Sequence, residues 1–241
     1  MLGVFKNIID FILPPRCLVC GKVINNDNGL CKDCFSNINF ITLPYCHKCG
    51  TPLAKTIKDN NFLCMNCLNP KNKNIFRISR SMVEYDTYSK KIILDFKFLD
   101  HLESKNLLVN WLEIAGKDIF EEGVDLILPI PLHYTRVFER KYNQSAILAK
   151  ELAKRKNISV LFDCLKKCKK TIPQVKCTGK NKRRKNVKGA FVVIDKDKIK
   201  GKRILLIDDV YTTGATLNEC AKVLLKAGAL SVDTLTIAKV C

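Results

Sequence analysis

The sequence predicts an α/β protein in which a parallel sheet forms the main domain and a small metal-binding domain precedes it. Three observations lead to this prediction. Four Cys-x-x-Cys pairs lie within the first 67 residues, apolar runs typical of buried parallel strands follow them, and segments with apolar helical faces separate those runs. We therefore expect a metal-binding domain over residues 1–70 and an α/β domain over residues 71–241.

The length and composition are those of a globular protein. The chain has 241 residues, of which 47% are hydrophobic, and this is ample for a core. No apolar stretch approaches the roughly 18 residues that a membrane-spanning helix needs. Two charges interrupt the segment Val4–Leu13, and a Pro-Pro pair closes it. We expect a short amphipathic helix docked on the protein there, with a membrane-surface anchor as the alternative.

The metal-binding domain is predicted from an internal repeat. Cys17-Leu-Val-Cys20-Gly21 matches Cys46-His-Lys-Cys49-Gly50, and a plainer Cys-x-x-Cys pair follows each of them. Four thiolates at this spacing favour zinc, so we expect two structural zinc ions. The eight ligands are Cys17, Cys20, Cys31, Cys34, Cys46, Cys49, Cys64 and Cys67.

Sequential pairing of the cysteines is the simplest arrangement, with one zinc on the first four and one on the last four. Crossed pairing, an iron-sulfur site, or metal loss with disulfides are the alternatives. Few large apolar side chains lie among these residues, so metal binding should contribute much of the folding free energy of the domain. Unoxidised metal knuckles fit a reducing compartment, and we expect a cytoplasmic protein.

The charge of the chain favours polyanionic partners. The formal net charge is +19, from 42 basic and 23 acidic residues. Two zinc-thiolate sites would lower this total to roughly +15. Such a charge suits single-stranded DNA, RNA or a pyrophosphorylated ligand, although a Lys-rich proteome would explain it without any partner.

Strands and helices alternate after the metal-binding domain. We expect a strand at Ile78–Tyr85, helices at Ser89–Leu99 and Leu102–Phe120, and a second buried strand at Asp125–Ile130. The stiff turn Pro131-Leu132-His133 follows that second strand. It is placed to form one lip of a ligand crevice at the carboxyl edge of a parallel sheet.

Basic residues cluster in two places. Arg136, Arg140 and Lys141 precede a helix that begins near Asn143 and runs to about Lys156, where they would neutralise pyrophosphate or only cover a helix surface. A second stretch, between Cys164 and Ile194, has eleven cations and no acid. Its densest part holds Lys180, Lys182, Arg183, Arg184 and Lys185. We expect this part to be mobile when free, and to close over a polyphosphate, hold a nucleic-acid backbone or remain solvated.

The segment Ile204–Thr216 carries the clearest chemical signal. Four apolar residues, two carboxylates and a Thr/Gly turn predict a buried strand, a phosphate-sized loop and a helix that begins near Ala215. Loop N–H groups, hydroxyls and the helix dipole would bind an anion, and Gly214 would allow a close approach. The two carboxylates would accept hydrogen bonds from sugar hydroxyls or meet a metal. Together they point to a ribose 5-phosphate ligand.

This segment resembles the signature with which phosphoribosyltransferases bind phosphoribosyl pyrophosphate, PRPP. The resemblance implies that Asp208 and Asp209 hold the ribose 2- and 3-hydroxyls, and that Mg²⁺ accompanies PRPP. It assigns the 5-phosphate to the loop residues Thr212, Thr213, Gly214, Ala215 and Thr216.

Nearly the whole chain resembles the ComF family of bacterial competence proteins, which join a double zinc ribbon to a type I phosphoribosyltransferase-like domain. The shared motifs are Tyr85-x-x-x-x-Lys90, Phe96-Lys97-Phe98, Pro129-Ile-Pro131-Leu132-His133, Arg140-Lys-Tyr-Asn143-Gln144, Pro173-Gln174 and Asn186-Val187-Lys-Gly189-Ala190-Phe191. Lys141 departs from the glycine expected before Tyr142. The resemblance adds His133, Arg136 and Arg140 to the PRPP site, and it leaves Arg183 and Arg184 competing for one catalytic arginine.

Two functions follow from this resemblance. The first is a cytoplasmic PRPP-binding factor in DNA uptake, which binds single-stranded DNA through the zinc ribbons and the five cations from Lys180 to Lys185 and which works with other competence proteins. The alternative is an active phosphoribosyltransferase that releases pyrophosphate from PRPP. In that case Asp208, Asp209 and one of Arg183 and Arg184 would serve catalysis.

Overall fold

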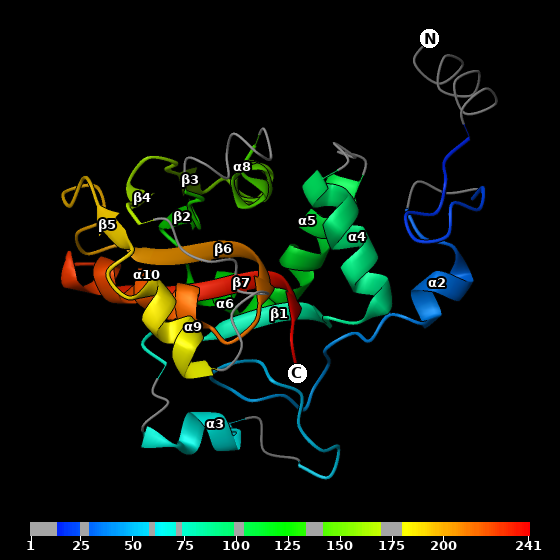
Figure 1. The fold of residues 1–241 in the computed structure, drawn as a ribbon, viewed down its shortest axis with the longest axis horizontal. Coiled ribbons are helices and arrows are strands. Elements are labelled where there is room, and N and C mark those ends of the chain that lie inside the picture. The colour runs from blue at the N-terminus through cyan, green and yellow to red at the C-terminus, as the bar shows by residue number, and fades with distance from the viewer. Residues whose placement is uncertain are drawn as a thin grey trace.

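A five-stranded parallel sheet forms the centre of the fold in the computed structural model, which describes residues 14–24, 29–57, 61–70, 74–98, 104–133, 142–169 and 180–241 (Figure 1). Every pair of neighbouring strands in this sheet is parallel, so the predicted fold class is confirmed. From one edge to the other, the strands are β1 (Ser79–Glu84), β7 (Ser231–Lys239), β6 (Arg203–Tyr211), β2 (Leu126–Pro129) and β3 (Ser159–Val160).

Helices cover both faces of the sheet. On one face α4 (Thr87–Phe98), α5 (Ser104–Ala115) and α8 (Gln144–Lys156) share a core with Leu205 and Ile207 of β6. On the other face α10 (Ala215–Lys226) packs on Ile204 and Leu206. Successive residues of β6 therefore point to two different cores, which is why the run is apolar throughout.

The elements differ from the expectations at two places. The predicted helix Leu102–Phe120 is two helices, α5 and α6 (Lys117–Glu122), because the backbone leaves helical geometry at Gly116. The densely basic segment forms the helix α9 (Lys180–Val187), which was not predicted. Buried Val187 joins the core that also contains α10, and the Gly189 N–H donates to Glu219 at 2.9 Å. These contacts attach the C-terminal end of α9 and the turn after it to α10.

Other features were missed or are not described. A two-stranded antiparallel sheet, β4 (Leu165–Lys167) with β5 (Phe191–Val193), flanks the main sheet and was not predicted. The segment Val4–Leu13 lies outside the described residues. Within the part of the chain that is described, no helix is both long and apolar enough to cross a membrane.

The two zinc ribbons attach to the α/β domain at different places (Figure 1). The first ribbon contains α2 (Lys32–Ser36), and its Val19, Ile24 and Leu30 share a core with α4 and α5. The second contains α3 (Met65–Leu68) and docks on β1 through backbone hydrogen bonds, such as that from the Ser79 N–H to the carbonyl of Lys48 at 2.8 Å. The first attachment is apolar, and the second is largely polar.

Candidate functional site

The two predicted ribose-binding acids lie near the carboxyl end of β6. The Asp208 Oδ1 atom accepts hydrogen bonds from the Ser145 hydroxyl at 3.1 Å and from the Asp209 N–H at 2.9 Å. Burial of the carboxyl, and then repulsion by Asp209, raises the pKa of Asp208 to about 7. The carboxyl can therefore exchange a proton near neutral pH, which lets it accept from or donate to a sugar hydroxyl.

Lys97 neutralises the second acid. Its Nζ atom lies 2.5 Å from Asp209 Oδ2, and both side chains are mostly buried. The carbonyl of Lys97 accepts from Gln144 at 3.1 Å, so the end of α4 is tied to the start of α8. The motif Phe96-Lys97-Phe98 was visible in the sequence, but nothing local indicated that its lysine would meet an acid more than a hundred positions away. Lys97 is thus a site residue that sequence reasoning missed.

The loop between β6 and α10 has the features of an anion site. Helix α10 begins at Ala215, as predicted, and Gly214 has φ of +70°. A Cβ atom on Gly214 would lie 2.4 Å from the Tyr211 hydroxyl oxygen, so only glycine fits. The Thr213 hydroxyl is buried and has no hydrogen-bond partner in the described structure. A phosphate oxygen would supply that partner and would face the positive end of the α10 dipole.

The remaining predicted residues divide into three groups. His133 is buried just beyond β2, whose end pairs with β6 through Pro129 and Ile207, so it lies at the same edge of the sheet as the acids. Arg136 and Arg140 lie outside the described residues. The predicted nucleic-acid residues form α9, which packs against α10. Lys182 and Lys185 are exposed there, and the side chains of Lys180, Arg183 and Arg184 are not described.

The cysteines form two tetrads that match the sequential pairing. In each tetrad the four sulfur atoms lie within 4.8 Å of one another. The members are Cys17, Cys20, Cys31 and Cys34 in the first, and Cys46, Cys49, Cys64 and Cys67 in the second. Four clustered soft sulfurs fit a tetrahedral zinc ion, so the two tetrads fit two zinc ribbons.

Burial and hydrogen bonding shift the pKa values of two thiols in the first tetrad in opposite directions. Burial opposes ionisation of Cys17, but backbone hydrogen bonds from Cys20, Cys31 and Val19 outweigh it and lower its pKa to about 6. Burial and neighbouring sulfurs raise the pKa of Cys34 in the same tetrad. Without a metal the sulfurs compete for protons, whereas a dication stabilises all four as thiolates.

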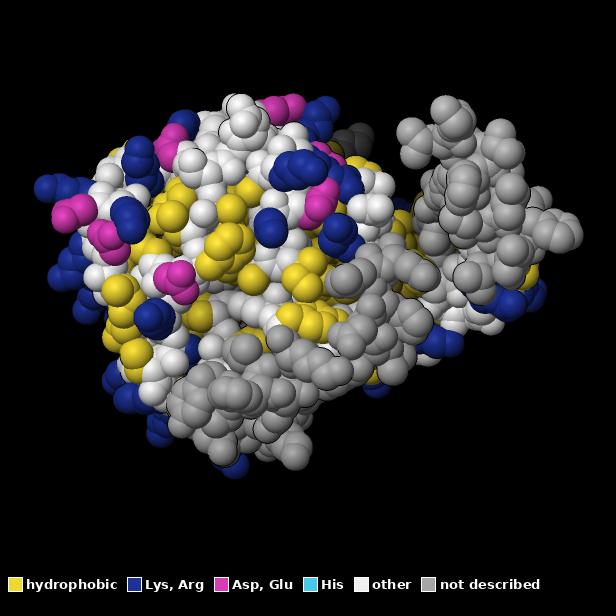
Figure 2. Space-filling model, turned by 90° about the horizontal axis from the view of Figure 1, so that it is seen from above, with side chains coloured by type: hydrophobic (Ala, Val, Ile, Leu, Met, Phe, Trp, Pro, Cys, Tyr) yellow, Lys and Arg dark blue, Asp and Glu magenta, His cyan; other side chains and the backbone are white. Residues whose placement is uncertain are grey.

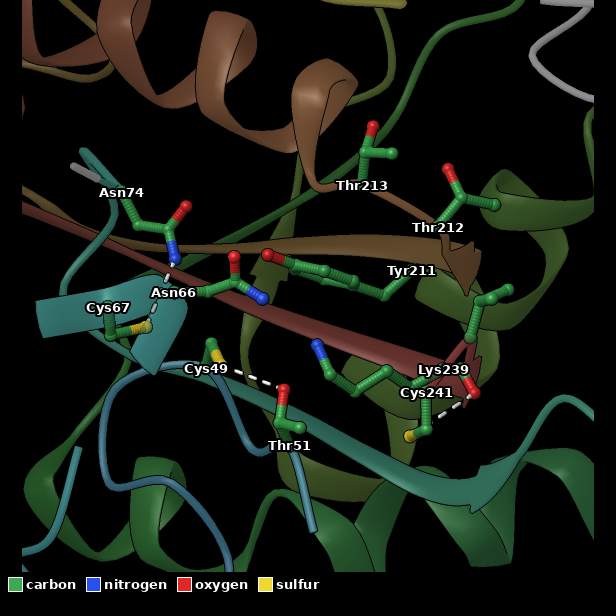
Figure 3. A pocket seen from close by; sticks show the side chains of 11 residues that line it. Cys49, Thr51, Asn66, Cys67, Asn74, Tyr211, Thr212, Thr213, Lys239 and Cys241 are labelled. Carbon is green, nitrogen blue, oxygen red and sulfur yellow. Dashed lines mark hydrogen bonds between the residues drawn. The ribbon is translucent and has the colours of Figure 1, made fainter. Parts of the chain in front are cut away.

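The second tetrad lies beside the phosphate-type loop. Cys49 and Cys67 line a cavity together with Tyr211, Thr212 and Thr213 (Figure 3). The residues that follow the acid pair in the chain therefore contact the same space as a zinc knuckle from residues 46–67. This proximity was not predicted, because no sequence pattern relates the two segments.

The fold and its sites define a protein class: a double zinc ribbon joined to a phosphoribosyltransferase fold. Residues 8–68 match the family described as double zinc ribbon domain, and residues 143–240 match the phosphoribosyl transferase domain. Competence protein F of Haemophilus influenzae is 31% identical to this chain, over 93% of this chain and 96% of its own length. The chain therefore belongs to the ComF family.

Two further relatives are also similar over most of their length. Competence protein ComFC of Bacillus subtilis is 26% identical and covers 89% of this chain and 86% of its own. DNA utilization protein YhgH of Escherichia coli K12 is 25% identical, and the similarity covers 90% of this chain and 87% of its own length. The names of these relatives link them to competence and to the use of DNA.

Proposed function

We propose that this protein is a cytoplasmic ComF-family factor that binds PRPP with Mg²⁺ and single-stranded DNA, and that it acts in DNA uptake. One observation carries the PRPP half of the proposal. The buried hydroxyl of Thr213, which has no partner in the described structure, and the left-handed turn at Gly214 lie four and five residues after Asp209 of the hydrogen-bonded acid pair. A ribose 5-phosphate group satisfies the hydroxyl, the helix N-terminus and the acids together.

Different residues would bind different parts of PRPP. Asp208 and Asp209 would hold the ribose hydroxyls, and the loop from Thr212 to Thr216 would hold the 5-phosphate. Lys97 neutralises Asp209 and so reduces repulsion between the acid pair and an incoming anion. His133, Arg136 and Arg140 would approach the pyrophosphate from beyond β2. Bound Mg²⁺ would neutralise pyrophosphate charge.

Charge supports the DNA half of the proposal. The net charge is +19, and basic side chains are spread around the face drawn in Figure 2, most densely at its left end. Helix α9 alone contains five cations and no acid, and its Lys182 and Lys185 side chains are exposed. Cations that neutralise phosphates release counterions, so DNA binding should weaken steeply with salt. The competence and DNA-use names of the relatives point the same way.

Calorimetric titrations test both halves. Mg-PRPP and a short single-stranded oligonucleotide are titrated separately, and then each in the presence of the other, which measures any coupling between the sites. We expect both to bind, the oligonucleotide with a steep salt dependence. Replacing Lys182, Arg183, Arg184 and Lys185 together by Ala should lower DNA affinity and flatten its salt slope, with PRPP affinity as the control. Absent or salt-insensitive DNA binding would contradict the DNA half.

A second candidate function is phosphoribosyl transfer, favoured by the cavity beside the loop. An acceptor nitrogen would form a bond to the anomeric carbon while the bond from that carbon to pyrophosphate breaks. Pyrophosphate leaves with the electron pair, and the acceptor nitrogen gives its proton to solvent. Arg183 or Arg184 would stabilise the leaving group. Pyrophosphate release from Mg-PRPP, measured with a panel of nucleobases, tests this function, and no release with any base would exclude transfer to those acceptors.

A further inference from the structure

A chain of hydrogen bonds joins the second zinc tetrad to the loop after β6. It begins at Cys67 of the tetrad, whose Sγ atom accepts from Asn74 Nδ2 at 3.6 Å (Figure 3). The Asn74 Oδ1 atom in turn accepts from Asn218 Nδ2 at 2.9 Å. Asn218 lies near the start of α10, and its backbone N–H donates to the carbonyl of Gly214 at 2.8 Å. Three hydrogen bonds therefore lead from a predicted zinc ligand to the glycine of the predicted phosphate loop.

Tyr211 connects the same two segments a second time. Its side chain forms a hydrogen bond with the Asn74 side chain. The hydroxyl end of its ring lies directly against Gly214, where a Cβ atom would clash with it. Tyr211 and Asn74 are both buried, and polar groups that lose a partner in such surroundings are costly to leave unpaired. These contacts therefore constrain how the ribbon and the loop sit against each other.

The direction of the hydrogen bonds is fixed at both ends of the chain. At one end, the Ile75 N–H donates to Asn218 Oδ1 at 2.7 Å. A backbone N–H can only donate, so the Asn218 oxygen faces Ile75 and its amide nitrogen faces Asn74. The Asn74 oxygen then accepts, and its nitrogen is left to donate to Cys67. A zinc-bound thiolate is an acceptor, so the order of donors suits a metal-bound Cys67.

Each end of this chain bears on a ligand. A hydrogen bond to a metal-bound group orients that group, and the loss of such a partner typically lowers metal affinity about 10–100-fold. At the other end, Asn218 holds the segment before β1 against the helix whose N-terminus would face the phosphate. A shift of the ribbon relative to α10 would stretch or break the bonds between them.

We propose that Asn74 and Asn218 are positioning residues that couple the second zinc site to the phosphate loop. A ligand at the loop then strengthens zinc binding, and zinc strengthens ligand binding by the same factor. This inference rests on the proposed binding of a ribose 5-phosphate group, and it names the residues that link this group to the ribbon. The first tetrad shares a core with α4 and α5, whereas α10 packs on the other face of the sheet, so the first zinc should not respond.

Competition with a zinc chelator, with and without saturating ribose 5-phosphate, measures this coupling. In the wild type we expect the ligand to raise the affinity for one zinc ion about tenfold and to leave the other unchanged. The responsive zinc should be the one that Cys67→Ser lacks. Asn218→Ala should hold two zinc ions and bind ribose 5-phosphate, but the ligand should change zinc affinity less than about twofold. Asn110→Ala is the matched control and should keep the full effect, because this exposed asparagine of α5 accepts only from Arg155 among the printed contacts of the described residues.

A double-mutant cycle separates coupling from independent structural support. Asn74→Ala should weaken the second zinc site about tenfold and should also abolish the effect of the ligand. If the two amides act as one unit, the double variant loses no more zinc affinity than Asn74→Ala alone, whereas independent contributions would add. If Asn74→Ala does not fold, Asn218→Ala still decides the question, because alanine is well tolerated within a helix such as α10.

The outcomes distinguish this inference from the proposed function. If ribose 5-phosphate binds the wild type but leaves both zinc affinities unchanged, the coupling is overturned and the proposed function stands. A full tenfold effect of the ligand in Asn218→Ala, or additive losses in the double variant, would likewise overturn the role of the asparagines alone. Failure of ribose 5-phosphate to bind the wild type would overturn the proposed function and the coupling together.

Discussion

The two zinc ribbons share a sequence motif but differ in how they join the rest of the protein. The first is fixed by apolar packing: Val19, Ile24 and Leu30 share one core with α4 and α5. The second forms its own small cluster of cysteines and docks on β1 through hydrogen bonds, with Arg80 donating to the carbonyl of His47 at 2.8 Å. Only the second borders the loop that follows the acid pair. The same cysteine motif therefore has a different environment in each ribbon. The first ribbon packs on α4 and α5, and the second lines the cavity beside the loop after β6.

Removing one zinc at a time should show the largest difference between the two ribbons. Cys31 and Cys67 are similarly half-buried members of the two tetrads, so Cys31→Ser and Cys67→Ser form a matched pair. Each variant should hold one zinc ion instead of two, measured by metal analysis of the purified protein. Affinity for Mg-PRPP should fall at least about tenfold in Cys67→Ser and remain near the wild-type value in Cys31→Ser. Equal losses in both would show that the ribbons are not different in this respect.

Two equivalent glycines, one in each ribbon, differ in how closely the neighbouring backbone approaches them. Gly21 and Gly50 occupy the same place in the repeat, with φ of +74° and +66°. A Cβ on Gly21 meets nothing within 4 Å, whereas one on Gly50 would lie 2.8 Å from the carbonyl oxygen of Ser79. Gly21→Ala should cost about 1 kcal/mol of unfolding free energy from the positive φ alone. Gly50→Ala should cost about 2–3 kcal/mol, because the ribbon must also move away from β1. Urea unfolding of both variants measures the difference, and equal costs would contradict polar docking of the second ribbon.

The pH dependence of the unfolding free energy tests whether the first ribbon affects the acid pair. The pKa of Asp208 is raised from an ordinary value of 3.8 to about 7, so between these pH values the native state holds a proton that the unfolded chain has lost. The stability that Asp208 contributes through this proton is therefore complete below pH 4 and is lost as pH rises toward 7. The unfolding free energy falls over this range by at most about 1.4 kcal/mol per pH unit. Chemical unfolding at several pH values should show this slope in the wild type and in Cys31→Ser. Asp208→Asn should lack it, and a slope that persists there would have another source.

The features that depend on neighbouring residues were predicted from the sequence, and those that depend on distant contacts were not. The segment Ile204–Thr216 was predicted correctly as strand, loop and helix, because its apolar run and turn residues act locally. The cysteine spacing likewise predicted two tetrads. By contrast, the contacts of Lys97 with Asp209 and of Ser145 with Asp208 join distant segments, and only the assembled sheet brings them together. Helix α9 was missed because its anchor, Val187, is a single apolar residue in a charged stretch. The placement of the second ribbon beside the loop had no local signal.

The hydroxyl of Thr213 offers the most direct test of the central claim, that the loop after β6 holds the phosphate of PRPP beside the second ribbon. Thr213→Val keeps the shape of the side chain and removes only a buried hydroxyl that has no partner in the described structure. Calorimetric titration with Mg-PRPP should show a loss of about tenfold in affinity, while urea unfolding of the free protein shows equal or higher stability. Unchanged PRPP affinity in Thr213→Val, at unchanged stability, would contradict the claim.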